Sequence, residues 1–234
     1  MALIIETEQG TFTGYLALPK GPPRGLVVVT QEIYGVNREV RRVADWLAAA
    51  GYAAVAPDLL WRVAPELDFG YADRDNARQA IGKLQPERIV SDIAAAAHAL
   101  RAHVPQGSNL GLALLALGWG GLYAYQAAGL SQASAIVSYY PGNLPNGIDI
   151  AKSIGIPQQI HLAFHDERTK PEFRRSLREA LAGLDDAEVL VYPDADHGFA
   201  NRDRQEFHAE SARLADDRTL DFLVRTLQHA DAPA

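Results

Sequence analysis

Three side chains in this sequence could move protons, namely those of His197, Asp166 and Glu32. An imidazole that is hydrogen-bonded to a carboxylate is held in one tautomer and can accept a proton from water or from a carbon beside a carbonyl. A second carboxylate among apolar residues would have a raised pKa and could give or take a proton near neutral pH. These three residues are therefore candidates for general acid–base catalysis.

A glycine-rich segment lies between an apolar run and an amphipathic run, with glycines at 118, 120 and 121. A tight turn from a strand into a helix needs positive φ and close backbone approach, which glycine supplies. The backbone amides at the start of the following helix could bind an anion or stabilise an oxyanion. We expect Gly118 and Trp119 to line the substrate site, with the indole either covering the turn or filling the space of a substrate carbonyl.

Short apolar runs alternate with longer amphipathic stretches, which predicts a mostly parallel sheet with helices on both faces. The predicted inner strands cover residues 26–30, 52–56, 110–117, 133–138, 159–163 and 188–192. The predicted helices cover residues 38–50, 73–83, 90–103, 171–184 and 203–229, with one more ending at residue 128. Residues 4–18 are expected to form one or two antiparallel strands at an edge of the sheet.

The candidate residues follow the ends of these strands, where ligands bind in open α/β sheets. Glu32 follows the first inner strand, Asp166 the fifth and His197 the sixth. A glycine-rich turn, then an acid, then a histidine is the chain order of an α/β-hydrolase, so the turn is expected to hold a nucleophile. The remaining candidates for substrate binding are the apolar and aromatic residues at the same ends, Ile33, Tyr34, Tyr139 and Tyr140.

Several segments carry a family resemblance, chiefly QEIYGVN at 31–37, APDL at 56–59, YYPG at 139–142 and HGFAN at 197–201. On these motifs the sequence resembles the dienelactone hydrolase (carboxymethylenebutenolidase) family. The resemblance implies a single α/β-hydrolase domain over residues 1–234, a catalytic His197–Asp166 pair and a role for Glu32 beside the nucleophile. It also implies a cysteine nucleophile in a Gly-x-Cys-x-Gly-Gly turn.

The sequence departs from the family at that nucleophile. It contains no cysteine, and residues 110–130 contain no Ser, Thr, Asp or Glu. Counting back from the two glycines places the nucleophile position at Gly118, whereas gapless counting forward from Asn109 places it at Ala116. Thr30 and Ser138 end strands but lie on no sharp turn, so neither is expected to replace the cysteine. The usual acyl-enzyme route is therefore not expected.

Three functions remain open at this point. His197, oriented by Asp166, could activate water against a small lactone, ester or carbonyl compound, with backbone amides at 118–121 stabilising the oxyanion and Glu32 as second acid or base. The same two groups could instead isomerise or cyclise a substrate by proton transfer. Alternatively, the protein could be an inactive relic of a hydrolase that binds a small ligand.

Four arginines are candidates for binding an anionic substrate, namely Arg62, Arg74, Arg78 and Arg202. The family's carboxylate-binding arginines do not map cleanly onto this sequence, because the residue that follows HGFA is Asn201. This argues against a dianionic substrate of the dienelactone type.

The composition argues against several other classes of protein. The 22 Lys and Arg against 29 Asp and Glu give a net charge of −7, which disfavours a nucleic-acid partner. The absence of cysteine excludes disulfides and cysteine-ligated metals, and we expect neither cofactor nor metal. The first residues have no basic segment, and no apolar run approaches the roughly 20 residues of a membrane span. The sequence thus predicts a cytoplasmic protein with a small-molecule partner, and the oligomeric state stays open.

Overall fold

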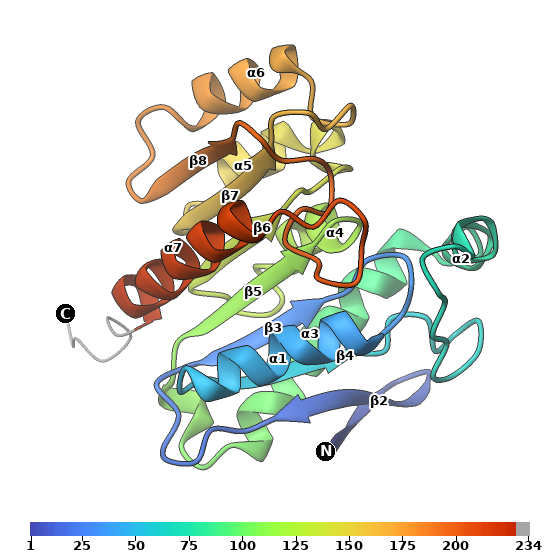
Figure 1. The fold of residues 1–234 in the computed structure, drawn as a ribbon. Coiled ribbons are helices and arrows are strands. Elements are labelled where there is room, and N and C mark those ends of the chain that lie inside the picture. Colours follow the sequence, from blue (N-terminus) through green and yellow to red (C-terminus); the bar gives the residue numbers. More distant parts are fainter. Residues whose placement is uncertain (228–234) are drawn as a thin grey trace.

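A twisted sheet of eight strands forms the centre of the computed structural model, which describes residues 1–227 (Figure 1). The strands are β1 (Ala2–Thr7), β2 (Gly10–Ala17), β3 (Leu26–Thr30), β4 (Ala53–Pro57), β5 (Leu112–Leu117), β6 (Ala135–Tyr139), β7 (Gln158–Ala163) and β8 (Ala187–Tyr192). Their order is β1-β2-β4-β3-β5-β6-β7-β8, and β3 to β8 are parallel while β1 and β2 are antiparallel. The six predicted parallel strands and the antiparallel N-terminal pair are confirmed. The sixth of them, β8, is however an edge strand, and β1 forms the other edge of the sheet.

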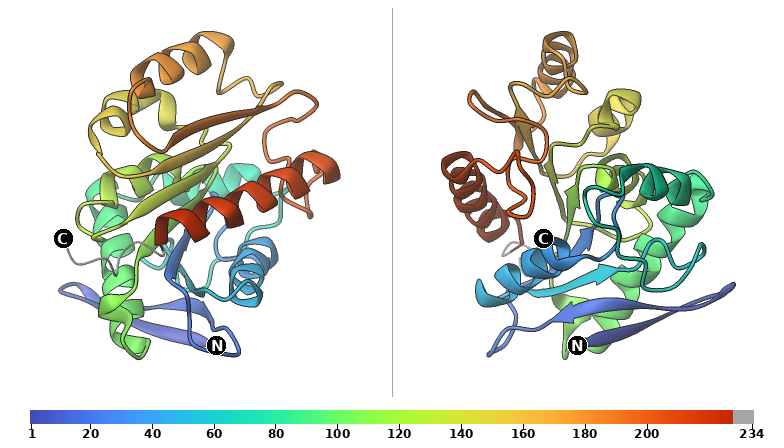
Figure 2. Two further views of the ribbon diagram at one scale, coloured as in Figure 1. Left: turned by 90° about the vertical axis from the view of Figure 1, so that its left-hand side faces the viewer. Right: turned by 45° about the vertical axis from the view of Figure 1, so that its right-hand side comes forward.

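Helices cover both faces of this sheet (Figures 1 and 2). One face packs against α1 (Arg38–Ala49) and α7 (Ala209–Leu227). The other face packs against α3 (Pro86–His103), α4 (Gly120–Ala127), α5 (Ile148–Ser153) and α6 (Pro171–Leu181). The remaining helix, α2 (Arg74–Ile81), lies beyond the carboxyl ends of the parallel strands. The α/β fold with helices on both faces is confirmed.

The strands β3, β4, β5 and β6 form because they are almost entirely apolar, as expected of parallel strands covered on both faces. Every residue of β3, β4, β5 and β6 is buried. The helix α1 begins where the Asn37 side chain accepts a hydrogen bond from the amide of Val40 at 3.1 Å, which satisfies an amide that the helix itself cannot. The burial of these strands fixes the positions of the loops at their ends.

Some helix boundaries differ from the predictions. The last helix begins at Ala209 rather than 203, because the ring of His208 accepts a hydrogen bond from the amide of Ser211 and so caps the helix there. Its predicted end at 229 lies outside the described residues. The helix α3 begins four residues earlier than predicted, at Pro86, since proline fits the first position of a helix. The short helix α5 was not predicted.

Candidate active site

The turn between β5 and α4 lies at the centre of the site. Gly118 occupies this turn with φ of +49°, a conformation that side chains rarely adopt. A Cβ at position 118 would lie 3.2 Å from Oε1 of Glu32. Ala116 instead lies within β5, paired with Thr30 on one side and Ser138 on the other, and all three are buried. Of the two alternatives that the sequence left open, Gly118 is the residue at the turn.

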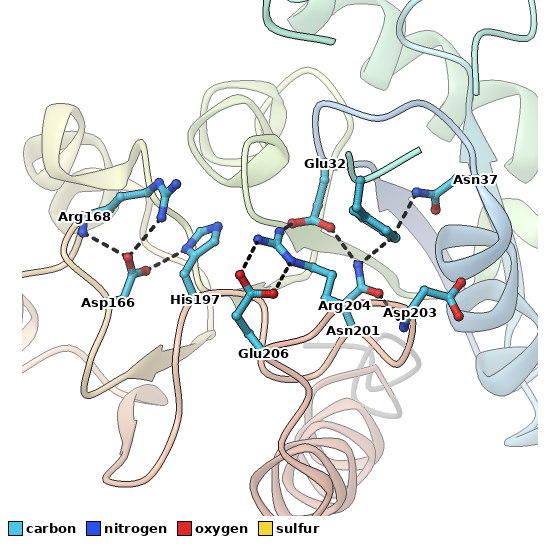
Figure 3. Close-up of polar contacts among 10 residues, drawn as sticks. Glu32, Asn37, Asp166, Arg168, His197, Asn201, Asp203, Arg204 and Glu206 are labelled. Atoms are coloured by element: carbon cyan, nitrogen blue, oxygen red, sulfur yellow. Dashed lines mark hydrogen bonds and ion pairs between the residues drawn. The ribbon is translucent and has the colours of Figure 1, made fainter. Parts of the chain in front are cut away.

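His197 and Asp166 form a hydrogen-bonded pair (Figure 3). Nδ1 of His197 lies 2.7 Å from Oδ2 of Asp166, whose side chain is fully buried while that of His197 is 15% exposed. The two residues come from the loops that follow β8 and β7. The geometry leaves Nε2 of His197 as the nitrogen free to act on a substrate, with Nδ1 as the donor to the carboxylate.

Asp166 is ionised in this environment. Burial alone would raise the pKa of its carboxyl, but the hydrogen bond and charge of His197, followed by the backbone amide and guanidinium of Arg168, hold the pKa below its usual value. The amide of Arg168 donates to Oδ1 at 2.9 Å, and Nη1 of the same residue lies 3.5 Å from that oxygen. A charged carboxylate can both orient the imidazole and stabilise an imidazolium.

Glu32 lies on the other side of the turn, buried among polar groups (Figure 3). Nη1 of Arg204 donates to its Oε1 at 3.1 Å, and Nδ2 of Asn201 donates to its Oε2 at 2.9 Å. Burial would lower the pKa of the Arg204 guanidinium, but the charges of Glu32 and Glu206 raise it above its ordinary value. Both oxygens of Glu32 are therefore occupied by donors from the loop that carries His197.

A chain of hydrogen bonds ties Glu32 to the start of α1. Asn201 Nδ2 also donates to the hydroxyl of Tyr71 at 2.7 Å, and Nδ2 of Asn37 donates to the same hydroxyl at 3.0 Å. The ring of Tyr71 packs edge-on against Tyr34, with centroids 4.8 Å apart. Through these contacts the residue that caps α1 also helps to hold the carboxylate in place.

A cavity of about 210 Å³ opens above the turn. This is room for several water molecules or a small metabolite. The residues that line it are Glu32, Ile33, Tyr34, Arg74, Arg78, Ile81, Gly118, Trp119, Gly142, Asn143, Arg168, His197 and Arg204.

The structure brings together most of the predicted site residues. Among the candidates for substrate binding, those that line the cavity are Ile33, Tyr34, Gly118 and Trp119. Tyr139 faces away, with its hydroxyl 3.1 Å from Oδ1 of Asp216 on α7, so its expected place in the substrate site is not what the structure shows. Tyr140 is buried and does not line the cavity, but it packs edge-on against the ring of His197.

The arginines divide into two groups. Arg74 and Arg78 line the cavity, as predicted. Arg62 instead forms an ion pair with Asp92, and Arg202 lines a separate small cavity between α1 and α7. Sequence reasoning missed Arg168 and Arg204, as well as Tyr71. The one available signal was position, because Arg168 follows Asp166 by two residues and Arg204 follows His197 by seven.

Two structural features are absent from residues 1–227. This part of the chain holds no group of three or more His, Cys, Asp or Glu side chains arranged to bind a metal ion. None of its helices is both long and apolar enough to cross a bilayer.

The sheet order, the turn after β5 and the His197–Asp166 pair at the strand ends define an α/β-hydrolase fold. The comparison with known families agrees, since the model of the dienelactone hydrolase family matches residues 12–227. The chain belongs to the dienelactone hydrolase family.

Individual relatives match along nearly the whole chain. An Azospirillum brasilense protein assigned as a carboxymethylenebutenolidase is 33% identical over 226 residues, which cover 94% of this chain and 96% of the relative. The carboxymethylenebutenolidase of Pseudomonas sp. strain P51 is 31% identical over 221 residues, covering 92% and 91%. A crystal structure from Klebsiella pneumoniae, assigned as a dienelactone hydrolase, superposes with a TM-score of 0.82 at 25% identity and covers 96% of this chain and 98% of its own.

Proposed function

We propose that this protein is an enzyme that performs acid–base chemistry on a small lactone, ester or carbonyl compound without a covalent intermediate. The observation that carries the proposal is the turn itself. Gly118 contributes only a hydrogen atom where it faces Glu32, while the His197–Asp166 pair and Glu32 are both held in place around the same cavity. Water or a substrate atom can take the position that a nucleophile side chain would fill.

In the hydrolytic form of the reaction, His197 Nε2 takes a proton from a water molecule while the water oxygen attacks the carbonyl carbon of the substrate. Asp166 stabilises the imidazolium that forms. The imidazolium then gives its proton to the leaving alkoxide as the carbon–oxygen bond breaks, which returns His197 to its neutral state.

The oxyanion would be stabilised by fewer amides than the sequence suggested. The amide of Gly118 already donates to the carbonyl of Tyr139 at 3.0 Å, and that of Gly121 donates to the carbonyl of Gly118 at 3.2 Å. The amides of Trp119 and Gly120 lie between them at the first turn of α4, where no carbonyl of the same helix can bond to them. Of these two residues only Trp119 lines the cavity, so we assign the oxyanion contact to its amide.

The same residues support proton transfer. His197 could remove a proton from a carbon beside a carbonyl while Glu32 returns one at another position, a reaction that needs no nucleophile. For that reaction Glu32 must exchange one of its two present donors for the substrate, and Arg204 has Glu206 as an alternative partner at 3.3 Å.

A second candidate is a small-molecule binding protein that retains the cavity but has no turnover. It is favoured by the state of Glu32, whose two oxygens already accept hydrogen bonds from Asn201 and Arg204. The two functions differ in one observable result, because a binding protein gains thermal stability with a ligand but forms no product.

The test is His197→Ala, assayed on a panel of lactones, esters and ketones, with solvent-deuterium exchange recorded for the ketones. We expect kcat/KM to fall by about 10²–10⁴-fold, the range for a positioned acid–base group. His165→Ala is the matched control, since this exposed histidine lies next to Asp166 but outside the cavity. Equal activity of wild type and His197→Ala would reject the proposal, and ligand binding without any product or exchange would favour the binding protein.

A further inference from the structure

We propose that Arg168 forms a second subsite for a negatively charged group, beside His197 and across the turn from Arg74 and Arg78. The substrate would then carry an anionic group at each end, with its reacting carbonyl between them above Gly118. The inference rests on the proposed function only in assigning the bound dianion as a substrate. The binding of a dianion itself depends on the cavity alone.

The charge of the cavity is opposite to that of the molecule. The chain has a net charge of −7, yet four arginines line the cavity against a single carboxylate, that of Glu32. Arg204 is already paired with Glu32 and Glu206. Arg168 shares the buried carboxylate of Asp166 with His197. Within residues 1–227, Arg74 and Arg78 form no ion pair, so the arginines outnumber the carboxylates that contact them and the cavity favours a negatively charged ligand.

These three arginines enter from two sides of the reaction centre. In the sheet, β4 lies two strands to one side of β5 and β7 lies two strands to the other. Arg74 and Arg78 come from α2, in the segment that follows β4, and Arg168 comes from the loop that follows β7. Since Gly118 directly follows β5, a carbonyl above the turn has cations on both sides.

Arg168 has a specific place beside His197. A Cβ at Gly142 would lie 2.6 Å from Cδ of Arg168 and 3.4 Å from Cε1 of His197, so the missing side chain at 142 makes room for the arginine stem next to the imidazole. Its guanidinium makes one long contact, 3.5 Å, with Asp166. A guanidinium has five N–H donors, and the others are available for a ligand.

Arg74 and Arg78 are one helical turn apart and therefore on the same face of α2. Among residues 1–227, no carboxylate forms an ion pair with either of them. A carboxylate between two adjacent guanidiniums relieves their mutual repulsion and can be bound through paired N–H groups. The sequence argued against a dianionic substrate because Asn201 stands where a carboxylate-binding arginine was sought. The arginines proposed here to bind the two anionic groups come instead from α2 and from the loop after β7.

The experiment measures binding by calorimetry and thermal shift, which need no turnover. The probes are succinate, glutarate, adipate and pimelate, each compared with the monocarboxylate of the same carbon number. We expect at least one dicarboxylate to bind about tenfold or more tightly than its monocarboxylate partner, and the difference to shrink as salt is raised.

The variant Arg168→Gln should abolish this preference while leaving monocarboxylate binding unchanged, and Arg78→Gln should weaken both kinds of ligand. Arg175→Gln is the control, because it removes an exposed arginine on α6 outside this cavity. Unchanged monocarboxylate binding also shows that Arg168→Gln has folded. Equal affinity of wild type for di- and monocarboxylates, no binding of either, or a preference that survives in Arg168→Gln would overturn the inference. Dicarboxylate preference in a protein without turnover would support the subsite and count against the proposed catalysis.

Discussion

Asp166 contacts both His197 and Arg168 and is the residue on which the orientation of His197 depends. One oxygen contacts the imidazole and the other contacts the amide and guanidinium of Arg168. Because these contacts lower the pKa of its carboxyl, Asp166 contributes stability whenever it is ionised. That contribution is present above about pH 4, the ordinary carboxyl value, and is lost as the pH falls through the lower value of the folded state.

The variant Asp166→Asn should therefore be less stable than wild type at pH 7, and the difference should narrow as the pH falls below about 4. Urea denaturation at a series of pH values measures this directly. The same variant should lose activity by as much as about 10⁴-fold, since an amide favours the wrong imidazole tautomer. A stability difference that is constant from pH 7 to 3 would show that the Asp166 charge contributes nothing to folding.

At the scale of secondary-structure elements, α7 is joined to the sheet by a buried polar network. The Tyr139 hydroxyl lies 2.7 Å from Oγ1 of Thr219 and donates to Asp216, and Thr219 also contacts His161. Burial lowers the pKa of His161 to about 3, so its ring is neutral there. This network explains why Tyr139 does not reach the substrate cavity, because its hydroxyl is hydrogen-bonded to Asp216 and Thr219 on α7.

The ionised form of Asp216 is destabilised in that network because its carboxyl is buried. Burial raises the pKa of its carboxyl to about 6, above the usual value of about 3.9. A raised pKa means that stability is fully present below pH 4 and is lost as the pH rises through 6. We expect Asp216→Asn, whose amide oxygen can still accept from Tyr139, to be more stable than wild type at pH 7.5 by about 1–3 kcal/mol.

The two proteins should be equally stable near pH 4, and guanidinium denaturation at both pH values tests this. Asp217→Asn is the control, since Asp217 is an exposed neighbour on α7 that pairs with Arg213. A wild type that is more stable than Asp216→Asn at pH 7.5 would mean that the charge of Asp216 is favourable where it lies.

The same elements show what the sequence could predict. The strands β3, β4 and β5 were predictable because they are almost entirely apolar runs. Asp166 and His197 were predictable because each lies in the loop after a strand, β7 or β8. Tyr139 and Tyr140 were grouped together as substrate-site residues, but both pack in the hydrophobic cluster under α1 and α7 and neither lines the cavity. Arg204 could not be placed, because its contact with Glu32 joins residues 172 apart through an irregular loop.

For the molecule as a whole, a hydrolase fold surrounds a turn at which Gly118 has no side chain. On the proposed function, His197, Asp166, the amide of Trp119 and the positive-φ residue after β5 have the positions that acyl transfer uses. We infer that one side chain separates this chain from covalent catalysis. The matched pair Gly118→Cys and Gly118→Ala isolates that side chain, because both variants carry the same backbone penalty at φ +49° and only one carries a nucleophile.

We expect both variants to be less stable than wild type by about 1–2 kcal/mol, the cost of a left-handed residue with a Cβ. Each must also displace the Glu32 carboxylate slightly, since Oε1 lies 3.2 Å from the new Cβ. Gly118→Cys should release p-nitrophenol from p-nitrophenyl acetate in a burst and gain one acetyl group by mass spectrometry. Gly118→Ala should do neither, and adding His197→Ala to the cysteine variant should remove the burst. A burst of equal size in both single variants, or none in Gly118→Cys at a stability equal to that of Gly118→Ala, would mean that the turn no longer presents residue 118 to the cavity as a nucleophile position.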